Sequence, residues 1–223
     1  MKLIAHRGKL SKTDIGNSKQ SLLNALSKSY ISGIECDVRL TKDLEVVVLH
    51  DPIIDFVSDG IGIVKYMTLK ELKQYQFGKE SILTLEELLK AIHSEKMICI
   101  ELKEDSIELV KKVISIVERY SDLNIIIISF WYSNLKYLKK IKPTIKVGLL
   151  IGYSLNNNRI YNHFNYNFFT YHYIEQIKMN KKIGFFTINQ KEQVLKLLQK
   201  RKDIYIITDV ANEFAKLEQL FPH

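Results

Sequence analysis

Eight apolar, β-branched segments of strand length recur along the 223-residue chain, and stretches with helical spacing lie between them. The strand-like segments span residues 2–6, 33–38, 97–103, 124–130, 146–151, 167–173, 182–188 and 203–209. Helical spacing is clear over residues 18–32, 106–120 and 190–201. Strands that are apolar on both faces are typical of parallel sheets covered by helices, and eight such units close into a barrel. The sequence therefore predicts an α/β fold, a single (β/α)₈ TIM barrel.

Residues 41–96 interrupt this alternation between the second and third units. They contain the apolar segment EVVVLH, a glycine-containing loop and two stretches of helical spacing near 68–76 and 84–93. An insertion at the strand-end side lies where barrels of this kind build their active sites. Gly and Pro are sparse and the sequence has no linker-like tract, so we expect one domain over residues 1–223 that carries this small insertion.

The composition limits where the chain works and what it binds. The opening MKLIAHRGKL has too short an apolar run for a signal peptide. The unbroken apolar run 125–128, which no other run exceeds, is far below the roughly 20 residues that cross a bilayer. The net charge is +8, but Lys and Arg are scattered and do not form one basic arm. We therefore expect a cytoplasmic protein with no membrane insertion and no nucleic-acid partner.

The chain has two cysteines, Cys36 and Cys99, which are too few for a disulfide framework. Side chains alternate between the two faces of a strand, and this alternation places the two thiols on opposite sides of the barrel wall. The sequence therefore predicts free thiols and favours a reducing compartment.

Two of the predicted strands carry acids near their ends. Glu35 and Asp37 share one face of GIECDVRL, and Glu101 shares a face of MICIELK with Lys103. If these faces point into the barrel, the acids need a cation, and oxygen ligands suit Mg²⁺ or Ca²⁺. Two simpler interpretations are solvated acids on a strand edge and a structural ion pair between Glu101 and Lys103.

Two histidines also lie at strand ends. His6 is followed by Arg-Gly, and His50 ends the EVVVL segment before Asp-Pro. Either histidine alone would more often be structural, but a pair beside an acidic cluster suits acid–base transfer across a phosphodiester. His172 in FTYHY is a weaker candidate for the barrel mouth.

Several motifs, taken in order, resemble the glycerophosphodiester phosphodiesterase family. In the first half these are AHRG, NSKQSLLNA, GIECDVRLTKD, VVVLHD, DGIG and IELK. The second half resembles the family more loosely, through ISFWYSNLKYLKKIKP, FFTIN and IITD. Agreement of many motifs in order and spacing makes the resemblance specific.

The resemblance implies a TIM barrel that hydrolyses a small-molecule glycerophosphodiester to glycerol 3-phosphate and an alcohol. It implies three ligands for one divalent cation, Mg²⁺ or Ca²⁺: Glu35, Asp37 and Glu101. It implies an acid–base pair, His6 and His50, and two basic residues at the phosphate, Arg7 and Lys103.

The chain departs from the family pattern at positions that would touch substrate. Gly16 stands where the family has Glu, Phe56 and Val57 stand where it has Arg and Thr, Phe186 replaces a Trp, and Ala211 replaces a Pro. None of these changes removes an implied ligand or histidine, but they leave room for a divergent substrate.

Two other functions stay open at this point. A phospholipase D-like enzyme acting on lysophospholipids would suit the basic charge and the tyrosine-rich residues 153–173. A non-catalytic phosphate- or polyol-binding barrel would suit the missing Glu at Gly16, although both histidines and all three acids are retained.

Overall fold

The computed structural model describes residues 1–152 and 163–220, so residues 153–162 of the tyrosine-rich stretch lie outside the described part. The strands are β1 Lys2–Ala5, β2 Gly33–Leu40, β3 Val46–Val48, β4 Gln76–Phe77, β5 Glu80–Ser81, β6 Met97–Leu102, β7 Asn124–Ser129, β8 Lys146–Ile151, β9 Tyr166–Phe169, β10 Lys182–Phe185 and β11 Tyr205–Thr208. The α-helices are α1 Lys19–Ser27, α2 Leu69–Leu72, α3 Leu85–Ala91, α4 Ile107–Val117, α5 Tyr132–Ile141, α6 Lys191–Lys200 and α7 Ala211–Leu220. Short 3₁₀ segments are η1 His6–Gly8, η2 Val64–Tyr66, η3 Glu118–Tyr120 and η5 Tyr171–Lys178.

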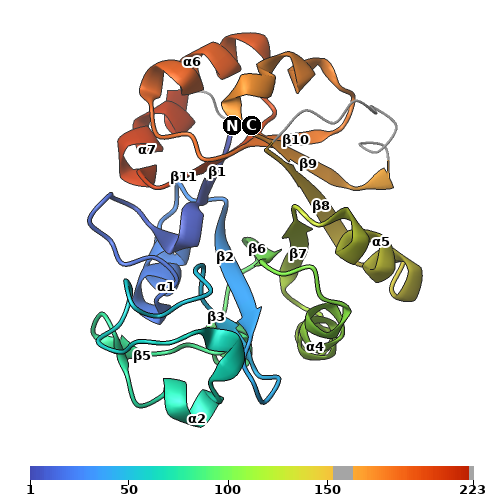
Figure 1. Ribbon diagram of the computed structural model, residues 1–223. Coiled ribbons are helices and arrows are strands. Elements are labelled where there is room, and N and C mark those ends of the chain that lie inside the picture. Colours follow the sequence, from blue (N-terminus) through green and yellow to red (C-terminus); the bar gives the residue numbers. More distant parts are fainter. Residues whose placement is uncertain (153–162, 221–223) are drawn as a thin grey trace.

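Eight parallel strands close into a barrel, as the sequence predicts. The order is β1-β2-β6-β7-β8-β9-β10-β11, and β11 pairs with β1 to complete the ring. Helices surround the strands (Figure 1). Because all eight strands run in one direction, their carboxyl ends meet at one end of the barrel.

Two apolar clusters account for the two faces of the barrel wall. The larger one lies between strands and helices and contains Cys36, whereas the smaller one fills the interior and contains Cys99, Phe168 and Tyr205. Both cysteines are buried and free. The predicted alternation of the two thiols is confirmed, since neighbouring residues of a strand point to opposite faces.

The insertion packs beside β2 through an antiparallel strand. β3 pairs with β2, with Val38 opposite Val48, and the segment that follows β3 forms a separate small core around Ile54 and Leu72. Capping boxes at Thr68 and Thr84 begin α2 and α3, since each threonine side chain accepts from a backbone N–H in the first turn. These helices are shorter than the predicted stretches 68–76 and 84–93.

The predicted strand 167–173 is wrong over its last part. β9 ends at Phe169, and the residues after Thr170 turn into η5, where His172 is exposed. The aromatic residues Tyr171 and Tyr173 continue the apolar pattern of the strand, but their side chains pack on the outer cluster from a helical segment.

Among the residues that the structure describes, no helix is both long and apolar enough to span a bilayer.

Candidate active site

Three carboxylates meet at the carboxyl ends of β2 and β6. Asp37 pairs in register with Glu101, and Glu35 pairs with Cys99 one layer deeper. One oxygen from each of Glu35, Asp37 and Glu101 lies within 4.8 Å of the others, and all three residues are buried. The strand alternation predicts this convergence, and the structure brings the three side chains together.

Burial and mutual repulsion shift the pKa values of this acid cluster, which consists of Glu35, Asp37 and Glu101. Burial raises the pKa of Glu35 well above its ordinary value, and the neighbouring charges of Asp37 and Glu101 add to the effect. Burial and Asp37 also raise the pKa of Glu101 to about 7. Burial opposes ionisation of Asp37 too, but Lys103 and Arg7 outweigh it and lower the pKa of that carboxyl. The cluster therefore holds its full negative charge only with added positive charge nearby.

The acid cluster fits a divalent cation. Glu35 Oε1 and Asp37 Oδ1 are buried and accept no hydrogen bond, although buried carboxylate oxygens nearly always find a donor. All candidate ligand atoms are carboxylate oxygens, which hard cations such as Mg²⁺ and Ca²⁺ prefer.

Two basic side chains border the acid cluster. Lys103 Nζ lies 2.7 Å from Glu101 Oε1 and 3.4 Å from Asp37 Oδ1, so the predicted ion pair within β6 and its extension is present. Arg7 Nε lies 3.2 Å from Asp37 Oδ2. The positively charged groups of Lys103 and Arg7 are therefore of the kind that can hydrogen-bond an anionic group at this place.

The turn that carries His6 and Arg7 has a restrained backbone. Arg7 adopts φ 55°, in the left-handed region, and its N–H donates to Glu35 Oε2 at 2.9 Å. Gly8 follows at φ 75°, and a Cβ there would lie 2.7 Å from the backbone of Leu22. Glycine is thus required at position 8, because only glycine fits between this turn and α1.

Asn17 ties the same turn to the acid cluster. Its backbone N–H donates to Arg7 O at 2.8 Å, and its side-chain Nδ2 donates to Asp37 Oδ2 at 2.8 Å. Asp37 N–H in return donates to Asn17 Oδ1 at 3.2 Å. Asn17 belongs to a motif quoted above, but the sequence gives it no role, since Asn17 lies in the loop before α1 and its partner Asp37 lies on β2.

The two histidines face the acid cluster from different segments. His6 Nε2 lies 3.8 Å from Glu35 Oε2, and His6 Nδ1 lies 2.8 Å from Asp209 Oδ1. His50 follows β3, and its Nδ1 lies 2.7 Å from Oδ1 of the adjacent Asp51.

The environment of His50 favours its neutral form. Burial lowers the pKa of His50, and the positive charges of Lys103 and Arg7 act in the same direction against Asp37 and Asp51. A neutral imidazole is able to accept a proton.

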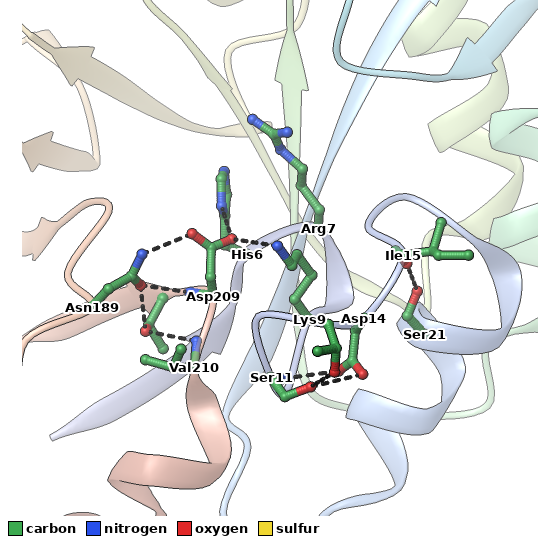
Figure 2. Close-up of polar contacts among 12 residues, drawn as sticks. His6, Arg7, Lys9, Ser11, Asp14, Ile15, Ser21, Asn189, Asp209 and Val210 are labelled. Carbon is green, nitrogen blue, oxygen red and sulfur yellow. Dashed lines mark hydrogen bonds and ion pairs between the residues drawn. The ribbon is translucent and has the colours of Figure 1, made fainter. Parts of the chain in front are cut away.

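Sequence reasoning missed Asp209 and Asn189 as parts of this site. Asp209 follows β11 and Asn189 follows β10, and Asn189 Nδ2 donates to Asp209 Oδ2 at 2.9 Å (Figure 2). The sequence offered one signal for Asp209, since this acid ends the eighth predicted strand, 203–209. Acids near the ends of two other strands, Asp37 and Glu101, were already candidates for the site. His172, by contrast, is exposed on η5.

A cavity of about 130 Å³ adjoins Arg7 and His50, between the turn at Gly16 and the insertion. Its lining also includes Lys9, Asp51 and Phe77. A Cβ at residue 16 would lie 2.9 Å from Arg7 Cβ. The departure to glycine at this position therefore leaves Arg7 and the cavity free of a side chain that the family pattern would place there. Of the other departures, Phe56 is 83% exposed.

Comparison with known proteins agrees with the site. Residues 6–207 match the model of the Glycerophosphoryl diester phosphodiesterase family. A glycerophosphodiester phosphodiesterase of Caldanaerobacter subterraneus subsp. tengcongensis is 34% identical over 164 residues, which cover 66% of this chain and 65% of that protein. One from Bacillus altitudinis is 31% identical over 67% of this chain and 66% of its own length. The chain thus spans about two thirds of these relatives.

Solved structures show the same fold. The glycerophosphodiester phosphodiesterase of Thermotoga maritima has a TM-score of 0.80 at 25% identity, over 96% of this chain and 97% of its own. An Oleispira antarctica phosphodiesterase, solved with the product sn-glycerol-3-phosphate, has a TM-score of 0.87 at 24% identity, over 98% of this chain and 97% of its own. Together with the family model, which matches most of the chain, these likenesses establish that the protein belongs to the glycerophosphoryl diester phosphodiesterase family.

Proposed function

We propose that this protein hydrolyses a small glycerophosphodiester to glycerol 3-phosphate and an alcohol, in a reaction that depends on one divalent cation. The observation that carries the proposal is the meeting of three buried carboxylates, two basic side chains and two histidines at the carboxyl ends of β1, β2, β3 and β6. Membership of the family supports the reaction class, and its relative from Oleispira antarctica holds sn-glycerol-3-phosphate.

The carboxylates of Glu35, Asp37 and Glu101 would hold the cation, Mg²⁺ or Ca²⁺. When bound, such a cation offsets negative charge that develops on the phosphoryl oxygens. Repulsion between the buried carboxylates raises the pKa values of Glu35 and Glu101. A bound cation would offset the same repulsion.

Arg7 and Lys103 would bind the phosphate oxygens. Both already contact Asp37, so a phosphate entering the site would share donors that are in place. The left-handed backbone at Arg7 and its N–H bond to Glu35 hold the guanidinium on the side of the acid cluster.

His6 and His50 would exchange the protons. Attack on phosphorus by water, or by a glycerol hydroxyl to give a cyclic diester that water then opens, breaks an O–H bond. Departure of the alcohol requires a proton on the leaving oxygen. One neutral and one protonated imidazole on opposite sides of the phosphate meet both needs. The rings lie on separate elements, η1 and the segment after β3, which suits this division.

The cavity next to Arg7 and His50 favours a small polar alcohol group. Its lining combines charged residues, including Lys9 and Asp51, with apolar ones such as Val57. A lysophospholipid substrate is the competing proposal and would need a surface for its acyl chain. A non-catalytic barrel is the third candidate, and retention of both histidines and all three acids speaks against it.

A metal-by-substrate panel tests the proposal. Purified protein is treated with a chelator and then assayed with Mg²⁺ or Ca²⁺ on glycerophosphocholine, glycerophosphoethanolamine and lysophosphatidylcholine micelles, with His6→Ala protein as the control. We expect cation-dependent release of glycerol 3-phosphate from the two small diesters. Equal or faster hydrolysis of the micelles would favour the lysophospholipid enzyme. Full activity after exhaustive chelation would remove the cation from the mechanism.

A further inference from the structure

The carboxylate of Asp209 is surrounded by donors from other segments. Its Oδ1 lies 2.8 Å from His6 Nδ1 and 3.7 Å from Lys9 Nζ, both on the segment that follows β1. Its Oδ2 accepts from Asn189 Nδ2 at 2.9 Å (Figure 2). Both oxygens are therefore engaged, and the orientation of the carboxylate is fixed.

Asn189 holds the backbone of Asp209 as well as its side chain. Asn189 Oδ1 accepts from Asp209 N–H at 2.9 Å and from Thr208 Oγ1 at 3.0 Å. The parallel register sets Ala5 beside Thr208, so the residues that follow, His6 and Asp209, also lie next to each other. Closure of the barrel between β1 and β11 thus creates this contact, and Asn189, in the segment that follows β10, stabilises it.

The proton on the His6 ring follows from this arrangement. Lys9 Nζ and Asn189 Nδ2, which face Asp209, carry hydrogens and cannot accept one from it, and an ionised carboxylate only accepts hydrogen bonds. Burial opposes ionisation, but the hydrogen bonds from His6 and Asn189 hold the pKa of Asp209 well below its usual range. In the neutral ring Nδ1 must then carry the hydrogen, which leaves a lone pair on Nε2. That nitrogen is the one that lies 3.8 Å from Glu35 Oε2, beside the acid cluster.

We propose that Asp209 is a positioning residue which, braced by Asn189, holds His6 as the Nδ1–H tautomer and directs Nε2 to the reacting oxygen. The inference rests on the proposed function for its substrate, whereas the tautomer is a property of the protein alone. In the reaction an O–H bond breaks as an N–H bond forms at Nε2, or the reverse. The carboxylate stays ionised and stabilises the imidazolium through Nδ1–H.

Asp209→Asn separates this role from packing. The variant keeps the size of the side chain but offers one acceptor and one NH₂ group to three donors. If the NH₂ turns to His6, Nδ1 must accept and the hydrogen moves to Nε2. If the oxygen turns to His6, the bond from Asn189 is lost.

We expect Asp209→Asn to lower kcat about 10²- to 10³-fold, with KM changed less than about threefold, because phosphate binding by Arg7 and Lys103 is left intact. Asn189→Ala should lower kcat about tenfold through a looser Asp209. The matched control is Asp43→Asn, which also removes a hydrogen-bonded carboxylate but lies in the insertion against Thr41 and Leu69. The control should keep kcat within about twofold.

Nitrogen NMR of labelled histidine gives the readout that does not need turnover. At a pH where the His6 ring is neutral, its signals, assigned with His6→Ala, should show hydrogen on Nδ1 in the parent protein. In Asp209→Asn they should shift toward Nε2–H where the new NH₂ group faces the ring. A neutral parent ring with hydrogen on Nε2, or an unchanged ring together with an unchanged kcat in the variant, would overturn the proposal. A loss of kcat shared by the Asp43 control would do so too. Failure of the parent to hydrolyse any glycerophosphodiester would refute the proposed function, and the spectra would still decide the tautomer.

Discussion

His6 and His50 are held in the same way by partners of different origin. In each case Nδ1 contacts an aspartate oxygen, at 2.8 Å for His6 and 2.7 Å for His50. Asp51 is the next residue after His50, whereas Asp209 is 203 positions away from His6. The His6 side chain is 16% exposed and that of His50 is 34% exposed. A pair made by barrel closure is therefore more enclosed than a pair made within one loop, and its geometry depends on more of the molecule.

Removal of either ring should have the largest effect. His6→Ala and His50→Ala should each lower turnover by about 10² to 10⁴, the range for loss of a positioned acid or base. Steady-state assays on the best substrate, with thermal melting as the check on folding, measure this. If one variant keeps full activity, that histidine is structural, and the comparison reduces to a single catalytic ring.

Substitutions in the acid cluster should lower activity without favouring either the His6–Asp209 or the His50–Asp51 pair. Glu35→Gln or Asp37→Asn should weaken cation binding and lower activity together by about 10²-fold, since each removes one of three charged ligands. Calorimetric titration with Mg²⁺ and Ca²⁺ measures the affinity, and added cation should restore part of the rate. Unchanged affinity in both variants would assign Asp37 to its ion pairs with Arg7 and Lys103, and Glu35 to the hydrogen bond from Arg7 N–H, instead.

Loss of Asp51, the partner adjacent in sequence, should lower kcat less than loss of Asp209, the distant partner. Asp51→Asn should lower kcat about tenfold, because Asp51 is 40% exposed and water is able to replace its contact with His50. Kinetics of this variant beside Asp209→Asn compares the two pairs directly. A larger loss for Asp51→Asn than for Asp209→Asn would reverse the order inferred from enclosure.

The change of thermal stability with pH should have opposite signs for the acid cluster and for Asp209. We expect it to be the smallest of the effects predicted here. The pKa of Glu101 is raised by burial and Asp37 to about 7, so the cation-free folded protein binds more protons than the unfolded chain between about pH 4.5 and 7. Its stability should therefore fall by a few degrees of Tm as pH rises through this window. The lowered pKa of Asp209 acts oppositely, since its contribution is present above its unfolded value and is lost as pH falls below about 4.

A cation should reverse the first trend, because its ligands must lose their protons to bind it. Melting curves at pH 6 and pH 8, with and without Mg²⁺ or Ca²⁺, measure both effects. We expect stabilisation by cation to be greater at pH 8. Equal stabilisation at both values would mean that Glu101 is not a ligand.

Part of the site could be predicted because it depends on one strand at a time. The alternation in GIECDVRL and MICIELK places Glu35, Asp37 and Glu101 on inward faces, and the structure has them there. The same local pattern overextends the strand at β9, because Tyr171 continues the apolar run. In the structure η5 begins at Tyr171, and this side chain packs against the outer cluster.

The sequence by itself indicated the barrel, the order of its strands along the chain and the shared face of Glu35 and Asp37, because side-chain periodicity is a property of a few neighbouring residues. Only the tertiary structure decided that His6 meets Asp209 and that Asn17 meets Asp37. Several strands end in an acid, and the residues near each strand end do not determine which of these acids will lie beside the first strand. That choice is made when β11 pairs with β1, a contact whose register depends on closure of the whole ring.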